Sequence, residues 1–286
     1  MVPFKTQLLK WVGNKQKIAH EIIAHFPSRF GAYHEPFLGS GAVMATLAPT
    51  RAYGADRFAP LMEIWKCLAR DPAELKSWYR DRYESYVQGD RTRQYERIKA
   101  DYNTSPNGAD FLFLSRSCYG GVVRFRKKDG YMSTPCGAHM PIKPATFERR
   151  VDIWAKRLRG STFTCADYRV SMARAEPGDL VYCDPPYADS QSILYGAQAF
   201  DMSDLLQQIA ACKARGVRVA LSLDGSKKSG THHCVTHTPD GLFEQEISVT
   251  LGRSMLRRFQ MGGQTLEGEH VHDRLLLTYP RASQAA

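Results

Sequence analysis

Long uncharged apolar stretches are absent from this chain of 286 residues. Lys5 and Lys10 interrupt the first apolar segment before it reaches the length of a signal peptide, and no segment approaches the roughly 18 apolar residues of a membrane span. We therefore expect neither secretion nor a membrane partner, and we predict a cytoplasmic protein.

Cysteine pairs of the CxxC type are missing as well, and the seven cysteines are an odd number. Structural zinc sites and disulfide frameworks use such pairs or even sets, so we predict reduced thiols and no bound metal. The cluster His232-His233-Cys234 with His237 lacks a second ligand pair at zinc spacing, and we interpret it as a polar surface loop.

Positive charge is in excess and unevenly distributed. The formal net charge is +10, and the stretch from Ser115 to Gly160 holds eleven Lys or Arg against three Asp or Glu. A solvated basic face is one interpretation of such a run. The interleaved Tyr119, Phe125, Tyr131 and Trp154 favour nucleic-acid binding instead, because bases need stacking surfaces as well as phosphate neutralisation.

Strand and helix patterns alternate in the first and last parts of the sequence. A strand flanked by apolar residues, over 33–37, leads through a glycine turn into a helical pattern over 42–48, and a second strand follows over 52–56. The same alternation resumes after residue 160, with strands within 161–168, 178–187 and 217–225 and a helix over 201–216. This order predicts an α/β, Rossmann-like nucleotide-binding sheet.

The stretch 60–160 has a different pattern. It is helical and rich in Arg, Tyr and Trp, and it continues into a predicted hairpin whose Asp129-Gly130 pair marks the turn. We interpret 60–160 as an inserted, mainly helical domain, with 1–59 and 161–286 as the two parts of the sheet domain.

The last part of the sequence predicts two further strands, over 244–251 and 273–280. A basic, glycine-containing loop joins them. We expect an antiparallel pair at the edge of the sheet.

A glycine turn, Phe37-Leu38-Gly39-Ser40-Gly41, lies between the first strand and its helix, where missing side chains let a ligand approach the backbone. Asp56 ends the next strand, where a carboxylate can accept hydrogen bonds from both hydroxyls of a ribose. A tight turn without a ligand is the alternative for the glycines alone. Met44 stands where a dinucleotide fingerprint needs its third glycine, which disfavours a nicotinamide cofactor.

Asp184-Pro185-Pro186-Tyr187 follows a buried-strand pattern and so belongs at the carboxyl edge of the sheet, where such folds bind ligands. Two prolines hold the backbone extended and remove two N–H donors, which leaves the Asp184 carboxylate and the Pro185 carbonyl as fixed acceptors. An exocyclic amine has two hydrogens to donate to them, and Tyr187 offers a face on which a base can stack. The motif predicts catalysis on a planar amine.

These motifs together resemble the Dam-type, D12 class of DNA adenine methyltransferases. The matching segments are, in order, Lys10-Trp11-Val12-Gly13-Asn14-Lys15, Glu35-Pro36-Phe37-Leu38-Gly39-Ser40-Gly41, Asp56, Asp167-Tyr168 and Asp184-Pro185-Pro186-Tyr187. The resemblance implies a methyltransferase sheet with an inserted target-recognition domain, S-adenosylmethionine as methyl donor and a flipped adenine as acceptor.

The resemblance also implies roles for individual residues. Trp11 and Lys15 would help to enclose the cofactor, Asp56 would hold its ribose, and Asp167 and Tyr168 would contact its adenine. The full predicted cofactor set is Trp11, Gly13, Lys15, Phe37, Gly39, Gly41, Asp56, Asp167, Tyr168 and Asp184.

The segment from Ser117 to Phe125 resembles the hairpin with which this family contacts DNA. In that comparison Tyr119 fills the gap left by the flipped base and Arg124 reads a guanine, whose O6 and N7 suit the arginine fork. The predicted DNA-binding set is Lys10, Tyr119, Arg124, Arg126, Lys127 and Lys128. Gly120 stands where enzymes of this type that act on GATC commonly have a polar residue, and the segment 253–263 also departs from theirs, so the target sequence stays open.

The predicted reaction is a direct transfer from S-adenosylmethionine to N6 of adenine in double-stranded DNA, without a covalent enzyme intermediate or a metal. Methylation of cytosine N4, or of an RNA or protein amide, is the alternative among enzymes, and the initial Asp184 disfavours it. A DNA-binding protein that retains the fold without turnover is the alternative from another class. The resemblance implies a bacterial or phage-encoded, nucleoid-associated protein, and it leaves open a cognate restriction endonuclease and a monomeric or weakly dimeric state.

Overall fold

The computed structural model describes residues 3–186, 200–224, 226–227, 232–233, 238–252 and 271–280. The expectations for Tyr187, for Cys234 and His237 and for the basic loop 253–270 fall outside these residues. Within the described part of the chain, no helix has the length and hydropathy to cross a membrane.

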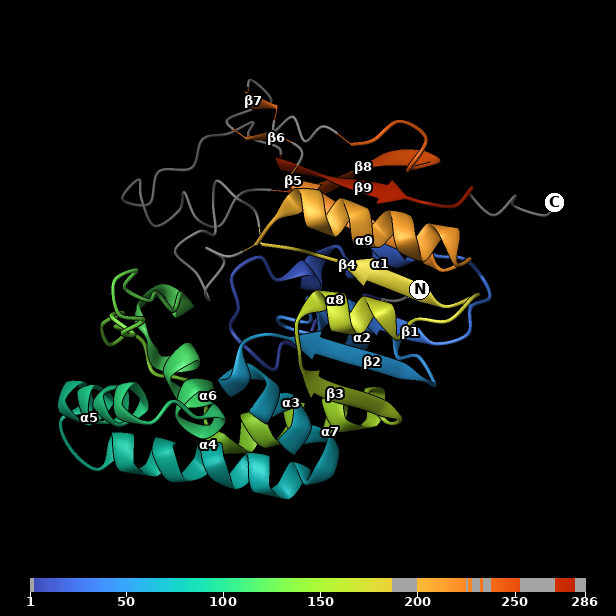
Figure 1. Ribbon diagram of the computed structural model, residues 1–286. Helices are drawn as coiled ribbons and strands as arrows, with labels where there is room; N and C mark the ends of the chain where they lie inside the picture. Colours follow the sequence, from blue (N-terminus) through green and yellow to red (C-terminus); the bar gives the residue numbers. More distant parts are fainter. Residues whose placement is uncertain are drawn as a thin grey trace.

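A seven-stranded sheet forms the centre of the molecule (Figure 1). Its strands, in spatial order, are β3 (Ser161–Cys165), β2 (Ala52–Asp56), β1 (Tyr33–Glu35), β4 (Leu180–Cys183), β5 (Arg218–Asp224), β9 (Val271–Leu277) and β8 (Gln245–Gly252). The first five run parallel, β9 is antiparallel to β5, and β8 is antiparallel to β9. The predicted α/β sheet and its terminal antiparallel pair are confirmed.

The order of the parallel strands reverses next to β1, because β2 lies on one side of it and β4 on the other. At such a switch point the connecting segments leave in opposite directions, so a crevice opens outside the carboxyl ends of the strands. Every residue of β1 and β4 is buried, as expected of central strands in a sheet that is covered on both faces. The glycine turn and Asp184 follow directly after these two strands.

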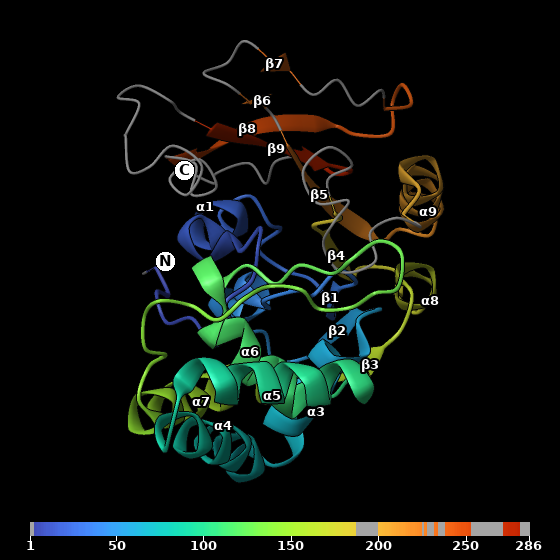
Figure 2. The same ribbon diagram turned by 90° about the vertical axis from the view of Figure 1, so that its left-hand side faces the viewer.

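Helices cover both faces of the sheet (Figures 1 and 2). The short helix η1 (Lys15–Lys17) and helices α1 (Ala19–Ile23) and α2 (Ala42–Leu47) lie on one face, and α8 (Tyr168–Ala173) and α9 (Met202–Ala214) lie on the other. A separate two-stranded ribbon pairs β6 (Ser226–Lys227) with β7 (His232–His233).

Five further helices gather beyond β3, as Figure 1 shows. They are α3 (Ala59–Arg70), α4 (Pro72–Val87), α5 (Arg91–Thr104), α6 (Gly108–Ser117) and α7 (Pro144–Arg157). Side chains of these helices and of the sheet form one continuous hydrophobic core, in which the Trp65 and Trp154 rings lie 5.5 Å apart. Because the core is shared, the domain boundaries at 59/60 and 160/161 stay a prediction.

The N-terminal segment is fixed to these helices by its backbone. Trp154, Arg150 and Arg116 donate hydrogen bonds to the carbonyls of three consecutive residues, at 2.9 Å to Thr6, 2.7 Å to Gln7 and 2.6 Å to Leu8. The segment that follows, with Lys10, Trp11 and Lys15, is thereby held across the carboxyl end of the sheet.

Candidate active site

A cavity of about 300 Å³ opens at the carboxyl ends of β1, β2 and β4. Most of the residues predicted for cofactor binding and catalysis line it: Trp11, Gly13, Lys15, Phe37, Gly39, Asp56, Tyr168, Asp184, Pro185 and Pro186. Five separate segments of the sequence therefore meet at one crevice.

Two of the predicted cofactor residues do not line this cavity. Gly41 has a left-handed φ of 61°, and a Cβ there would lie 3.3 Å from the Trp65 ring, so packing against that ring accounts for this glycine. Asp167 caps α8 by accepting a hydrogen bond from the Arg169 amide at 2.9 Å. The contacts of these two residues with the cofactor stay predictions.

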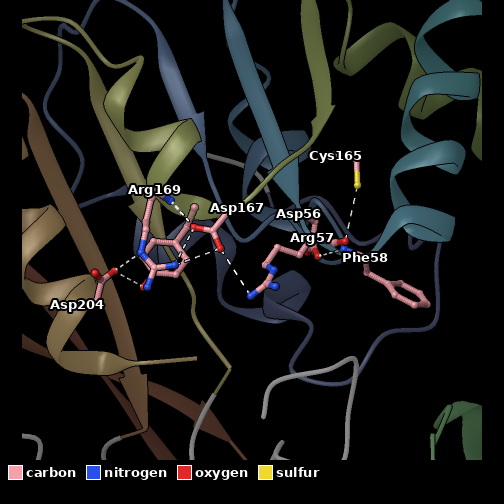
Figure 3. A network of polar contacts seen from close by, with 8 residues as sticks. Asp56, Arg57, Phe58, Cys165, Asp167, Arg169 and Asp204 are labelled. Atoms are coloured by element: carbon pink, nitrogen blue, oxygen red, sulfur yellow. Dashed lines mark hydrogen bonds and ion pairs between the residues drawn. The ribbon is translucent and has the colours of Figure 1, made fainter. Parts of the chain in front are cut away.

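Asp167 belongs to a polar network beside the cavity (Figure 3). Its carboxylate lies 3.6 Å from the Arg57 guanidinium and 3.3 Å from that of Arg169, which also pairs with Asp204 at 2.8 Å. Tyr168 donates a hydrogen bond of 2.5 Å to the same Asp204. The network fixes the Tyr168 ring at the cavity wall.

Aromatic rings form that wall. Phe37 stacks on Tyr168 with ring centroids 5.1 Å apart, and Phe200 meets Phe37 edge-on at 5.8 Å. Phe200 and Phe58 also line the cavity, but no motif in the sequence marks them. An isolated aromatic residue is far more common in cores than in binding sites.

The glycine turn and the end of β2 are joined by Asp56. Its carboxylate accepts hydrogen bonds from the amides of Gly39 at 3.1 Å and Phe58 at 3.0 Å. Gly39 has a φ of 46°, and a Cβ there would lie 2.8 Å from the Trp11 indole nitrogen. Only glycine fits this position without displacing Trp11.

The Asp184 carboxylate is held by Lys15. The Lys15 ammonium lies 2.8 Å from Asp184 Oδ1 and 3.6 Å from Asp273 Oδ2, and both Lys15 and Asp273 are almost completely buried. Asp273 lies on β9, far from every motif in the sequence. The acidic residue within the apolar strand pattern around 271–277 is the feature from which a buried, functional Asp273 could have been predicted.

Glu35, at the end of β1, is a second buried carboxyl group in the cavity wall. Tyr33 and the Met44 amide donate hydrogen bonds to its Oε2, at 2.9 and 3.0 Å. Burial raises the pKa of Glu35 to about 8, and the Asp184 carboxylate adds to the rise. Glu35 directly precedes the glycine turn in the sequence, but no role was predicted for it.

The predicted hairpin is confirmed at residues 118–136. Antiparallel bridges join Cys118 to Cys136 and Phe125 to Met132, and Gly130 turns the chain with a φ of 68°. The hairpin lies on the side of the molecule where the parallel strands end (Figures 1 and 2).

The residues predicted to contact DNA lie along this hairpin. Tyr119 is half exposed, and Arg124, Lys127 and Lys128 are exposed. Arg126 pairs with Asp129 at 2.8 Å and lies over the Tyr131 ring. The side chains of Arg124, Lys127 and Lys128 are therefore accessible from solvent.

Lys10 meets the hairpin from the N-terminal segment, because a Cβ on Gly121 would lie 3.5 Å from the Lys10 Cβ. Burial lowers the pKa of Lys10, and the positive charges of Arg116 and Arg150 lower it further. The two parts of the predicted DNA-binding set are therefore in contact.

Comparison with known proteins assigns this site to a family. A model of the D12 class N6 adenine-specific DNA methyltransferases matches residues 11–233. This chain belongs to that family. The match spans the N-terminal motif, the glycine turn, Asp56, the hairpin and Asp184.

Curated proteins of the same kind are similar over much of the chain. A DNA adenine methylase of Vibrio cholerae serotype O1 is 29% identical over 80% of this chain and 82% of its own. The retron Ec67 DNA adenine methylase of Escherichia coli is 33% identical over 63% of each chain. The type II methyltransferase M.MjaIII of Methanocaldococcus jannaschii is 29% identical over 63% of this chain and 68% of its own.

Replacing Glu35 by Gln should change how the stability of this methyltransferase depends on pH. Between the usual glutamate pKa of 4.5 and about 8, the folded protein holds a proton on Glu35 that the unfolded chain has lost. The free energy of unfolding of the wild type therefore decreases as pH rises through this window, and Glu35→Gln should lack that part of the decrease. Urea unfolding at pH 5.5 and pH 9 measures it.

The exposed Glu84 on α4 provides the control, because Glu84→Gln should follow the wild type at both pH values. Parallel pH profiles for Glu35→Gln and the wild type would show that Glu35 ionises normally.

Proposed function

We propose that this protein transfers a methyl group from S-adenosylmethionine to N6 of an adenine flipped out of double-stranded DNA. The observation that carries the proposal is the single cavity in which the glycine turn and Asp56 face the Asp184-Pro185 acceptor pair. This arrangement supports a nucleoside-binding half next to an amine-binding half.

The residues of the cavity fit S-adenosylmethionine. Asp56 at the end of β2 can accept hydrogen bonds from ribose hydroxyls, and the stacked Phe37 and Tyr168 offer an apolar wall for a purine. Trp11 closes the side of the glycine turn, and Glu35 lies in the cavity wall, where a positively charged group of the ligand would favour its ionised form. When bound, this cofactor supplies an electrophilic methyl group next to a positive sulfur.

Asp184 and Pro185 orient the target amine. The carboxylate and the carbonyl oxygen accept its two hydrogens, which directs the nitrogen lone pair out of the plane of the base and toward the methyl carbon. Lys15 holds Asp184 in place, and Asp273 holds Lys15. Tyr187, predicted to stack on the base, lies outside the described residues and keeps that role as a prediction.

The hairpin supplies the DNA contacts. Tyr119 would fill the gap that the flipped adenine leaves, and Arg124 would read a guanine edge in the major groove. Lys127, Lys128, Arg126 and Lys10 would meet phosphates. A cytoplasmic location, a cognate restriction endonuclease and the oligomeric state also stay predictions.

Asp184→Ala should lower the rate of methyl transfer by about 10²–10³-fold or more, because it removes a negative acceptor from the developing positive charge on nitrogen. DNA affinity should change little, since the hairpin is intact. Single-turnover transfer of a labelled methyl group and fluorescence anisotropy with the same duplex measure the two properties. Near wild-type transfer by Asp184→Ala would contradict the mechanism, and DNA binding without transfer by the wild type would favour the catalytically silent alternative.

Asp56→Ala should weaken cofactor binding by about 1.5–3 kcal/mol, the usual contribution of hydrogen bonds to a charged group. Calorimetry with S-adenosylhomocysteine measures the change. Asp81→Ala on α4 is the control, because this exposed carboxylate does not line the cavity and its loss should leave the affinity unchanged. Unchanged affinity in Asp56→Ala would contradict the proposed contact with the ribose.

Arg124→Ala should weaken binding to the cognate site by about 1–3 kcal/mol and relax the base preference at one base pair. Lys127→Ala should weaken cognate and non-cognate DNA alike and reduce the salt slope by about one unit, because one fewer counterion is released. Methylation rates on duplexes with single-base substitutions, at matched salt, separate these effects. If Arg124→Ala lowered the methylation rate equally on all of these duplexes, Arg124 would belong to the phosphate contacts.

A further inference from the structure

Two cysteines face each other where the hairpin leaves the helices. Cys118 follows α6 and Cys136 is its antiparallel partner. The pair is bracketed by hydrogen bonds from the Tyr119 amide to the Pro135 carbonyl, at 2.9 Å, and from the Gly137 amide to the Ser117 carbonyl, at 2.8 Å. This pattern defines a non-hydrogen-bonded pair, whose Cα atoms lie about 4.5 Å apart with both side chains on one face.

The two thiols share one environment. Cys136 Sγ lies 3.5 Å from the Tyr86 hydroxyl, and Cys118 Sγ lies 3.8 Å from the Ser115 carbonyl. Burial is the main cause that raises the pKa of Tyr95, and the Cys118 and Cys136 thiols raise it further. The two sulfurs therefore lie near the same phenol. The α4 and α5 helices thus enclose the pair from the side opposite the solvent.

The two cysteines differ in access to solvent. Cys118 is 4% exposed, and burial raises the pKa of its thiol to about 12. Cys136 is only partly buried. A small oxidant therefore reaches Cys136 first, and Cys118 is the neighbour that can resolve the oxidised form.

We propose that Cys118 and Cys136 form a reversible disulfide at the base of the hairpin when the protein meets hydrogen peroxide. The Cys136 sulfur attacks one peroxide oxygen, the O–O bond breaks, and a sulfenic acid and one water form. The Cys118 thiol then loses its proton and attacks the Cys136 sulfur, whose hydroxyl leaves with that proton as a second water. Two thiols and one hydrogen peroxide yield one disulfide and two waters, and a dithiol reductant reverses the change.

The disulfide alters the geometry of the hairpin. Disulfides prefer Cα separations of about 5.5–6 Å, so the bond widens the base of the hairpin by about 1 Å. Tyr119 follows Cys118 directly, and the Arg124 amide is held by Thr134, two residues before Cys136, at 2.8 Å. A wider hairpin base therefore shifts Tyr119 and Arg124, the two proposed base contacts. The expected loss of DNA recognition rests on the proposed function, whereas formation of the disulfide does not.

Peptide mapping tests the modification. The full-length protein is treated with hydrogen peroxide, its remaining thiols are blocked with iodoacetamide, and its digest is analysed by mass spectrometry. We expect a linked peptide pair containing Cys118 and Cys136 that dithiothreitol releases, that Cys136→Ser abolishes, and that the control Cys165→Ser, which changes an exposed thiol elsewhere, retains. Sulfinic or sulfonic acid at Cys136 without a link, or links between other cysteines such as the buried Cys183 and Cys212, would overturn the proposal.

Methylation kinetics test the consequence. Oxidation should lower kcat/KM for DNA by about 10-fold to 10²-fold, the range that a 1 Å displacement can produce. Affinity for S-adenosylhomocysteine should stay unchanged, and reduction should restore the rate. An unchanged kcat/KM in protein shown to be cross-linked would overturn the effect on DNA. Absence of methylation by the reduced protein would count against the proposed function and not against the disulfide.

Discussion

The Lys15 ammonium lies between two carboxylates, Asp184 after β4 and Asp273 on β9, and this buried contact connects the parts of the site. Removing a charge of this kind from water costs several kcal/mol, so the ammonium and its two partners stabilise one another only while all three are in place. The N-terminal segment, the central strand and the last strand are consequently fixed in one register. The direction in which Asp184 presents its acceptor follows from this arrangement.

A second constraint fixes the opposite wall of the cavity. Asp56 holds the Gly39 amide, and Trp11 fills the space that the missing Gly39 side chain leaves. Trp11 is itself positioned because α6 and α7 hold the backbone just before it, through Arg116, Arg150 and Trp154. The helices that follow β2 thus contribute to the shape of the cofactor pocket as well as carrying the hairpin.

The sequence predicted those parts of the structure that are encoded locally. The strands, the glycine turn, Asp56 and Asp184 stand in short patterns with their own physical meaning, and the fold follows from their alternation. Asp273 reaches Lys15 through the pairing of β9, and Phe200 reaches the cavity through the packing of α9. No local pattern specifies either contact. The cofactor contact of Asp167 stays a prediction, because an acidic residue after a strand can cap a helix as readily as it can contact a ligand.

The position of β9 has a consequence for how the protein is made. This strand lies between β5 and β8 although it is the last of the three in the sequence. On the ribosome, β5 can pair with β4, but β8 has no partner until β9 emerges. A nascent chain halted before β9 already carries the five parallel strands, the glycine turn and Asp184, but it lacks Asp273, the second carboxylate beside Lys15. The complete support of Asp184 is thus acquired only after β9 has been synthesised and paired.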